Sequence, residues 1–324
     1  MATYYGTYGQ KVQYLASDPS DPQIGQVWYN STSAVLKVRS VSTTGTFASG
    51  GNLGTPRTGV GNANAGTQTA TLAFGGSGTS TASESYNGTS WTSTPSLNTG
   101  RNNLTGSGTQ TAALAYGGDS TVYNTSTEAF NGSSWTSVNS LNTGRNQLGG
   151  IGIQTASLAF GGTGSPVFLA STESWNGTSW TSVNSLNTGR ELIRGTGTQT
   201  AGLGFGGNNG AAVNNNESWN GTSWTATTVM PTSLWGRGGA GTQTATVAFG
   251  GGTQAPSVVT NTDLWNGSAW TSNPTGLATA RYYIGSAGTQ TSAIGFGSAN
   301  TPTATLTEEW NGPGTAETRT VTVS

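Results

Sequence analysis

Arginine and carboxylate residues recur once per repeat along this chain, and they are the first candidates for chemistry. Six carboxylates could in principle form an acid/base or metal array. Charges that recur in every repeat are, however, spread around the molecule and cannot converge on one substrate. We therefore expect each arginine to pair with a carboxylate and with backbone carbonyls, as a structural lock between strands or sheets. The predicted ion-pair residues are Arg57, Arg101, Arg145, Arg190, Arg237, Arg281, Glu84, Glu128, Glu173, Glu217, Asp263 and Glu308.

Other catalytic arrangements find few residues to use. The chain has no histidine and no cysteine, which removes the commonest metal ligand and general base and every Ser-His-Asp or Cys-His arrangement. The carboxylates outside the repeat form no convincing pair, although a carboxylate-based glycan hydrolase stays an alternative. They are Asp18, Asp21, Asp119, Glu191, Glu309 and Glu317. We predict a protein that is not an enzyme and that uses no metal and no cofactor.

The composition limits the partners. The net charge is −1 over 324 residues, with no cluster of either sign, so no basic stripe is present to bind nucleic acid. No apolar run approaches the ~20 residues that a membrane span needs. Charged residues are only 7% of the chain, which alone would favour disorder. The 11 Trp, 10 Tyr and 8 Phe recur at fixed offsets, however, and that regularity indicates a folded repeat.

The segment GTQTA recurs with small variations, and its glutamines lie 42, 44, 45, 44 and 47 residues apart. Periods of this size with four short strands are typical of β-propeller blades. In the repeat 101–144, strands are predicted at 102–108, 112–116, 126–130 and 134–138. The Asn-Gly between the last two strands predicts a tight hairpin, which also explains the apparent glycosylation pattern there. The glutamines are Gln68, Gln110, Gln154, Gln199, Gln243 and Gln290.

A glycine pair, an aromatic residue after a Glu or Asp, a Trp about five residues on and a closing Arg follow one another in these repeats. This order resembles the kelch repeat, and the resemblance implies an all-β, six-bladed β-propeller over residues 46–312. The paired aromatic residues are expected to pack between neighbouring blades rather than to bind sugars. They are Tyr86/Trp91, Phe130/Trp135, Trp175/Trp180, Trp219/Trp224 and Trp265/Trp270.

The sixth repeat lacks its fourth strand, and the start of the chain supplies a candidate for it. The segment TFASGGNLGTPR at 46–57 aligns with 134–145 and places Phe47 at the position of Trp135. We predict that this N-terminal strand completes the sixth blade and closes the ring, which removes exposed sheet edges. Residues 313–324 are predicted to form a tail or an extra strand that could pair beside the closing strand.

The two faces of such a propeller differ in how much the repeats vary. The turns Gly-Thr-Gln-Thr and Asn-Gly on one face are nearly invariant, whereas the other face carries loops that differ in every repeat and variable positions after each repeat arginine. Variable loops on a rigid scaffold suit recognition, although loops that drift without selection would look the same. The candidate ligand-binding residues are Tyr123, Phe168, Val213, Glu191, Arg194, Trp235, Tyr282 and Tyr283.

Residues 1–45 form a separate segment with its own resemblance. The run 24–32, IGQVWYNST, followed by VLKV at 35–38, resembles a β-hairpin found in phage tail-fibre and other virion proteins. Together with the Trp-Asn-Gly-rich repeats, the layout resembles structural proteins of marine phages. The resemblance implies a fibre, knob or appendage on the virion surface, attached to other virion proteins through residues 1–45. The variable face would then bind a host-surface glycan or protein; the alternative is a purely structural capsid or tail decoration.

Overall fold

The computed structural model describes residues 12–41, 44–120, 123–165, 167–254, 257–299, 303–314 and 316–321. The predicted all-β class and the four-stranded repeats are confirmed, because the described residues form seven four-stranded sheets. Helix is limited in these residues to a 3₁₀ turn at Thr303–Thr305. In the described part of the chain no helix has the length and apolar character of a membrane span. Two compact units result, Met1–Gly45 with Asn311–Ser324, and Thr46–Trp310.

The first unit contains the sheet β1-β2-β3-β28, formed by β1 (Gln13–Leu15), β2 (Val27–Asn30), β3 (Val35–Val41) and β28 (Ala316–Thr320). Strands β2 and β3 are an antiparallel hairpin, and β1 lies parallel to β2. The C-terminal strand β28 pairs with β3, not beside the strand at 46–49 as we considered from the sequence. The seven-residue β3 is longer than its partner β2 and offers β28 a free edge.

Asp18 organises the polar side of this small sheet. Its carboxylate accepts hydrogen bonds from Trp28 Nε1 at 3.0 Å and Asn30 Nδ2 at 2.7 Å, and it pairs with Lys37 Nζ at 2.6 Å. These donors, Lys37 first, lower the pKa of Asp18 to about 2. Trp28 is fully buried, so the hairpin packs around its indole.

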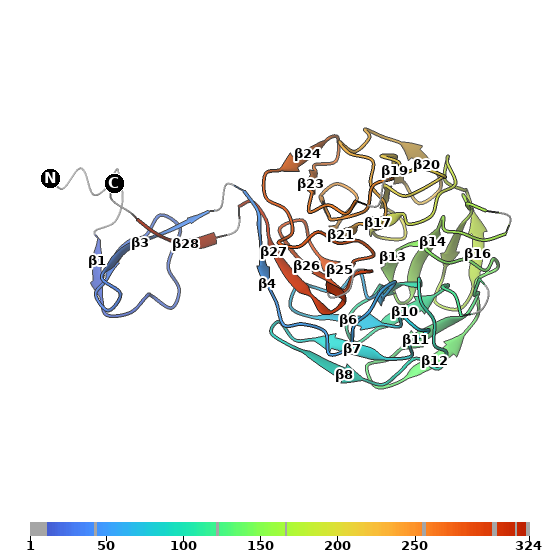
Figure 1. The fold of residues 1–324 in the computed structure, drawn as a ribbon, viewed down its shortest axis with the longest axis horizontal. Coiled ribbons are helices and arrows are strands. Elements are labelled where there is room, and N and C mark those ends of the chain that lie inside the picture. Colours follow the sequence, from blue (N-terminus) through green and yellow to red (C-terminus); the bar gives the residue numbers. More distant parts are fainter. Residues whose placement is uncertain are drawn as a thin grey trace. The chain divides into compact units, whose positions relative to one another are not determined.

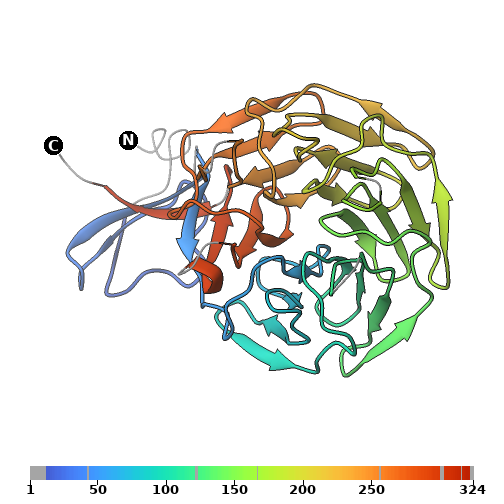
Figure 2. The same cartoon turned by 45° about the vertical axis from the view of Figure 1, so that its right-hand side comes forward.

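The second unit contains six four-stranded sheets, which we call repeat sheets 1 to 6; each is numbered from its inner strand outwards. Figures 1 and 2 show them arranged around a common centre, which is a propeller-like fold. Sheet 1 is formed by β5 (Gly61–Asn62), β6 (Thr71–Phe74), β7 (Ser83–Tyr86) and β8 (Trp91–Thr94). Sheet 2 is formed by β9 (Thr105–Gly108), β10 (Ala113–Tyr116), β11 (Thr127–Phe130) and β12 (Trp135–Val138). Sheet 3 is formed by β13 (Gly149–Ile153), β14 (Ala156–Phe160), β15 (Thr172–Trp175) and β16 (Trp180–Val183). Sheet 4 is formed by β17 (Arg194–Gly197), β18 (Gly202–Phe205), β19 (Asn216–Trp219) and β20 (Trp224–Ala226). Sheet 5 is formed by β21 (Gly238–Gly241), β22 (Thr246–Phe249), β23 (Thr262–Trp265) and β24 (Trp270–Asn273). Sheet 6 is formed by β25 (Gly285–Gly288), β26 (Ser292–Phe296), β27 (Thr307–Asn311) and β4 (Thr46–Ser49).

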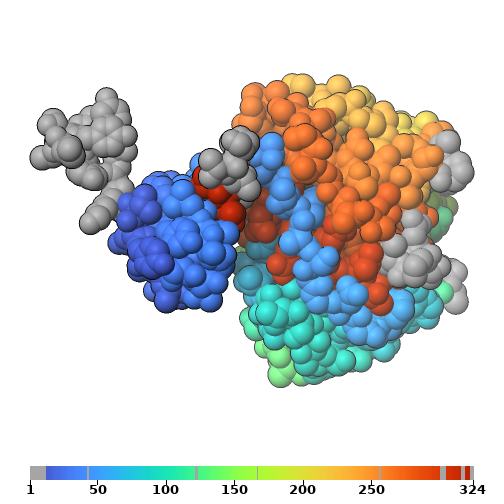
Figure 3. Space-filling model, turned by 60° about the vertical axis from the view of Figure 1, so that its left-hand side comes forward, coloured from blue at the N-terminus to red at the C-terminus, as the bar shows by residue number. Residues whose placement is uncertain are grey.

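Repeat sheet 6 combines strands from both ends of the unit. Strand β4 is its outer strand, beside β27, and the Phe47 ring lies 5.0 Å from the Trp310 ring. Gly50 N donates to Thr307 O at 2.9 Å, which continues the pairing past β4. In Figure 3 the light-blue segment that contains β4 runs against the red strands of this sheet. The last repeat sheet is therefore built from residues more than 250 positions apart.

Glycine in the inner strands makes room for aromatic rings that extend from the second strands. A Cβ on Gly149 would lie 2.3 Å from Cε2 of Phe160, and one on Gly106 would lie 2.4 Å from Cζ of Phe74. Phenyl rings therefore occupy the space that side chains on these inner strands would need. The glycine-rich composition reflects close packing around the centre rather than disorder.

Neighbouring repeat sheets touch through one aromatic contact each. An aromatic residue of the second strand meets the Trp that opens the fourth strand of the next sheet, with ring centroids 4.7 to 5.3 Å apart; Phe47 takes the place of that Trp in sheet 6. Such tilted or edge-on pairs add roughly 0.5–1.5 kcal/mol beyond their buried area. The six pairs are Phe74–Trp135, Tyr116–Trp180, Phe160–Trp224, Phe205–Trp270, Phe249–Phe47 and Phe296–Trp91.

A glutamine also connects each repeat sheet to the preceding one. The Gln of every Gly-Thr-Gln-Thr turn, or its variant, donates from Nε2 to a backbone carbonyl at the end of the third strand of its neighbour, at 2.5 to 2.7 Å. We had interpreted these residues only as turn formers. The six bonds are Gln68 to Trp310 O, Gln110 to Tyr86 O, Gln154 to Phe130 O, Gln199 to Trp175 O, Gln243 to Trp219 O and Gln290 to Trp265 O.

Candidate functional site

The six arginines and six acidic residues predicted as ion pairs do pair, and they form no array. Each pair is buried within one repeat sheet, with N–O distances of 2.5 to 3.1 Å, and the arginine also donates to backbone carbonyls. Burial lowers the pKa of Arg101 to about 10, and the Glu128 carboxylate opposes that shift. The pairs are Arg57–Glu84, Arg101–Glu128, Arg145–Glu173, Arg190–Glu217, Arg237–Asp263 and Arg281–Glu308.

Arg237 reaches its partner from a different backbone position than the other five. In sheet 4 the arginine, Arg190, accepts at its carbonyl from Gly162 N, and in sheet 5 Leu234 makes the equivalent bond with Gly207 N. Sheet 4 thus has Arg190 followed three positions later by the apolar Ile193, whereas sheet 5 has the apolar Leu234 followed three positions later by Arg237. Arg237 lies six residues before its glutamine, against nine in repeats two, three, four and six. In this repeat the shorter Asp263 takes the place of the glutamate and pairs with Arg237 at 2.7 Å.

Besides the loops between second and third strands, the repeats differ at the two positions that follow the arginine position. We call these twelve residues the mouth, because they surround one end of the central channel. They are Thr58, Gly59, Asn102, Asn103, Asn146, Gln147, Glu191, Leu192, Trp235, Gly236, Tyr282 and Tyr283. The next position is apolar in five of the six repeats, so variation is confined to the mouth and to the loops beside it.

The second mouth residue of every repeat has a left-handed backbone. The φ angles lie between 51° and 63° for Gly59, Asn103, Gln147, Leu192, Gly236 and Tyr283. A chain of backbone hydrogen bonds links them from sheet to sheet: Asn103 N to Gly59 O, Gln147 N to Asn103 O, Leu192 N to Gln147 O, Gly236 N to Leu192 O and Tyr283 N to Gly236 O, at 2.7 to 3.1 Å. The inner rim of the mouth is therefore held by the backbone, whatever side chains it carries.

Four of these six left-handed positions carry a side chain, although glycine would adopt the conformation freely. A left-handed L-residue costs roughly 1–2 kcal/mol. Such strain gathers at functional sites, where the side chain is needed. The four residues are Asn103, Gln147, Leu192 and Tyr283.

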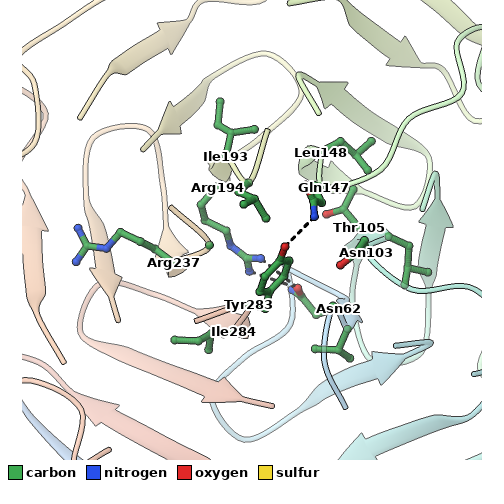
Figure 4. Close-up of a pocket in the computed structure, with 15 residues that line it drawn as sticks. Asn62, Asn103, Thr105, Gln147, Leu148, Ile193, Arg194, Arg237, Tyr283 and Ile284 are labelled. Atoms are coloured by element: carbon green, nitrogen blue, oxygen red, sulfur yellow. Dashed lines mark hydrogen bonds between the residues drawn. The ribbon is translucent and has the colours of Figure 1, made fainter. Parts of the chain in front are cut away.

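Tyr283 extends across the mouth. Its hydroxyl accepts a hydrogen bond from Gln147 Nε2, on repeat sheet 3, at 2.7 Å (Figure 4). Burial raises the pKa of Tyr283 above its usual value, and the nearby charges of Glu191 and Asp119 raise it further. The phenol therefore stays protonated, with its own proton available to donate.

Below Tyr283, Arg194 crosses the channel from sheet 4. Its guanidinium donates to Asn62 Oδ1 at 3.3 Å and to Ser286 O at 3.0 Å, and it also contacts Ser286 Oγ. Burial lowers its pKa to about 10. Arg194 makes no ion pair with any residue that the structure describes. These two side chains bound a cavity of about 60 Å³, which has room for only a few water molecules.

The mouth has an aromatic side and a polar side. Trp235, Tyr282 and Tyr283 pack together on sheets 5 and 6, with ring centroids 4.8 to 6.1 Å apart. On sheets 2 to 4, Asp119 Oδ2 accepts from Asn146 Nδ2 at 2.6 Å, and Glu191 Oε2 accepts from Thr163 Oγ1. A cluster of three aromatic rings thus lies on one side of the channel end, and hydrogen-bonding groups lie on the other side.

Five of the eight predicted ligand residues belong to this arrangement, namely Glu191, Arg194, Trp235, Tyr282 and Tyr283. The other three, Tyr123, Phe168 and Val213, lie on the loops between second and third strands and do not line the cavity. Tyr123 bridges to Asp119 and Phe168 to Thr163, so these loops support the polar side from outside. Parts of the predicted variable loops (121–122, 166, 255–256 and 300–302) lie outside the described residues.

The opposite end of the channel has a different character. A cavity of about 230 Å³ is lined there by 64–67, 195–198, 239–242, 288 and 289. These are glycine, alanine, threonine and asparagine residues from the near-invariant turns. The larger cavity offers no charge and no aromatic ring to orient a ligand.

The described residues contain no cluster of acidic side chains suited to a metal ion. No family model and no curated protein sequence matches the chain. Function must therefore be argued from the site itself.

Proposed function

We propose that the second unit is a six-bladed, kelch-like β-propeller closed by strand β4. The interface between sheets 6 and 1 supports closure, because it repeats the contacts of the other five. Gln68 Nε2 donates to Trp310 O at 2.7 Å, and the Trp91 ring lies 4.7 Å from the Phe296 ring. A ring closed in this way opens only if β4 detaches from β27.

We further propose that the mouth is a recognition site for a host-surface glycan or protein. The observation that carries this proposal is the set of four non-glycine residues held at positive φ around the channel. Because glycine would adopt this backbone without strain, the side chains kept at these four positions support a role of their own at the mouth. Aromatic and amide side chains on a rigid rim also suit recognition.

In this proposal the chain is a surface protein of a phage virion, and the first unit attaches it to other virion proteins. The attribution rests on the resemblance of the hairpin at 24–38 to those of phage fibre proteins. Exposed apolar side chains in that unit support attachment, since Tyr14 and Ile24 are 75% and 61% exposed. Purely structural decoration is the competing outcome of the test below.

The test is binding of the labelled full chain to a glycan array and to intact bacterial cells. The mouth variant replaces Asn103, Gln147 and Tyr283 with glycine, which the positive φ allows. Thr178→Ala, at an exposed Asn-Gly turn, is the matched control. We expect the mouth variant to lose binding and the control to keep it. Binding that survives in the mouth variant, or no binding by the unaltered chain, would refute recognition at the mouth.

A further inference from the structure

We infer that the mouth binds a neutral saccharide that stacks on Trp235, and that it rejects acidic sugars. This inference rests on the proposed recognition function and specifies its ligand.

The indole of Trp235 packs against Gly252, which has no side chain in its way. A Cβ on Gly252 would lie 2.7 Å from Cζ2 of the indole and 2.9 Å from two other ring atoms. Asp119, Thr163 and Asn208 occupy the equivalent bridge position in sheets 2 to 4. Only a glycine leaves room for an indole to lie flat at this position, so one ring face is supported by backbone.

The aromatic side forms a platform rather than a cage. The Trp235 and Tyr282 centroids are 4.8 Å apart at an interplanar angle of 85°, and Tyr283 lies 5.1 Å from Tyr282. Rings in direct contact leave no space for a cationic group between them, although cations are bound by cages of such rings. A surface of this kind suits the C–H face of a pyranose ring, which is apolar on its face and polar at its edge.

The charges at the mouth select for neutral ligands. Glu191 is itself a mouth residue, and Asp119 bridges to Asn102 and accepts from Asn146 Nδ2, two other mouth residues. Both carboxylates raise the pKa of the Tyr283 hydroxyl. Two arginines line the cavity beside them: Arg237 is paired with Asp263, and Arg194 is bonded to Asn62 and Ser286 deeper in the channel. A carboxylate on the ligand would therefore meet two negative charges first. Sugar hydroxyls, by contrast, donate to carboxylates.

Hydrogen-bonding capacity is available opposite the platform. The described bonds of the two acids use Oδ2 of Asp119 and Oε2 of Glu191, so a second oxygen on each remains to accept from ligand hydroxyls. The Tyr283 hydroxyl accepts from Gln147 and can donate its own proton. The cavity beneath, about 60 Å³, is too small for a sugar ring, so the saccharide lies on the mouth with Tyr283 as its floor.

The test uses the full chain on arrays of neutral and acidic glycans, followed by titration with the best neutral ligand. Trp235→Ala removes the platform, and Gly252→Ala displaces the indole without changing a polar group. Both should weaken binding roughly tenfold or more. Asn208→Ala, at the bridge position of sheet 4, is the matched control and should bind normally. Glu191→Gln should weaken neutral binding and admit acidic glycans.

The outcomes separate this inference from the function on which it rests. Neutral binding that Gly252→Ala abolishes supports both. Mouth-dependent binding of acidic glycans or of a cationic ligand alone overturns the inference and leaves recognition standing. Mouth-dependent binding to cells without any glycan ligand does the same and indicates a protein receptor. Binding unaffected by the mouth variant, or absent from glycans and cells alike, refutes both.

Discussion

The interfaces between repeat sheets and the mouth are built from the same repeats, yet they treat sequence in opposite ways. At the interfaces, a glutamine bond and an aromatic contact recur six times, and each repeat sheet also contains one buried ion pair. At the mouth, the backbone repeats its left-handed turn while the side chains differ from sheet to sheet. One chain thus contains six internal copies against which each position can be compared.

Under the proposed function, this difference separates residues that stabilise the fold from residues that bind a ligand. A side chain that every copy retains, such as Gln154, makes a contact that every copy needs. Gln147 lies at a position where the backbone is the same in every repeat but the side chain differs, so its side chain does not make a contact that every copy needs. The predictions below test this division, beginning with the residues expected to matter most for folding.

Loss of a buried ion pair that recurs in every repeat sheet should have the largest effect. Arg145→Ala removes the partner of Glu173 and donors to the carbonyls of Gly161 and Ser171. An unpaired buried carboxylate costs about 3–5 kcal/mol. We expect a loss of that size in the free energy of unfolding, measured with denaturant. An unchanged unfolding midpoint would show that the buried pair is dispensable.

The exchanged residues of sheet 5 allow a second test of comparable size. Arg237→Leu should destabilise about as strongly as Arg145→Ala, because Asp263 loses its partner. Adding Leu234→Arg and Asp263→Glu recreates the arrangement of sheet 4. We expect the triple variant to recover most of the lost stability. If the triple variant were no more stable than Arg237→Leu, the two arrangements would not be equivalent.

The glutamine bonds should contribute less. Gln154→Ala removes the side-chain donor to the buried carbonyls of Phe130 and Ala113, which costs roughly 1–3 kcal/mol. Gln68→Ala removes the same bond between sheets 1 and 6. If the ring is closed, the two variants should lose similar stability in parallel denaturation curves. A silent Gln68→Ala beside a damaging Gln154→Ala would contradict closure.

Much of the fold was readable from the sequence because each repeat is locally determined. Strand length, the Asn-Gly turn and the spacing of aromatic residues are all encoded within some 45 residues. Two features were missed because they depend on contacts between distant segments. The carbonyl that accepts from Gln154 lies 24 residues earlier, in another sheet, and β28 pairs with β3 across the whole chain. Nothing local in either segment indicates the partner.

The site was predictable where the backbone repeat fixes position. Glu191, Trp235 and Tyr282 each follow the arginine position, so a common backbone brings them together. Tyr123 and Phe168 lie on irregular loops, whose course the repeat does not determine. Asp119 had no partner in our interpretation, although its position directly after the glycine pair was a usable signal. Gly252 was missed because an absent side chain shows its role only beside the indole that it accommodates.

The smallest expected effect on stability belongs to the mouth, and repeat sheet 3 offers the sharpest contrast. Gln147 and Gln154 are seven residues apart on the same sheet. Gln147→Gly removes one hydrogen bond to Tyr283, a loss of about 1 kcal/mol, but it also relieves roughly 1 kcal/mol of left-handed strain. We expect the free energy of unfolding to stay within about 0.5 kcal/mol of the unaltered chain, while glycan binding falls. A destabilisation equal to that of Gln154→Ala would show that the mouth supports the fold, and the positive φ angles would then lose their value as a sign of recognition.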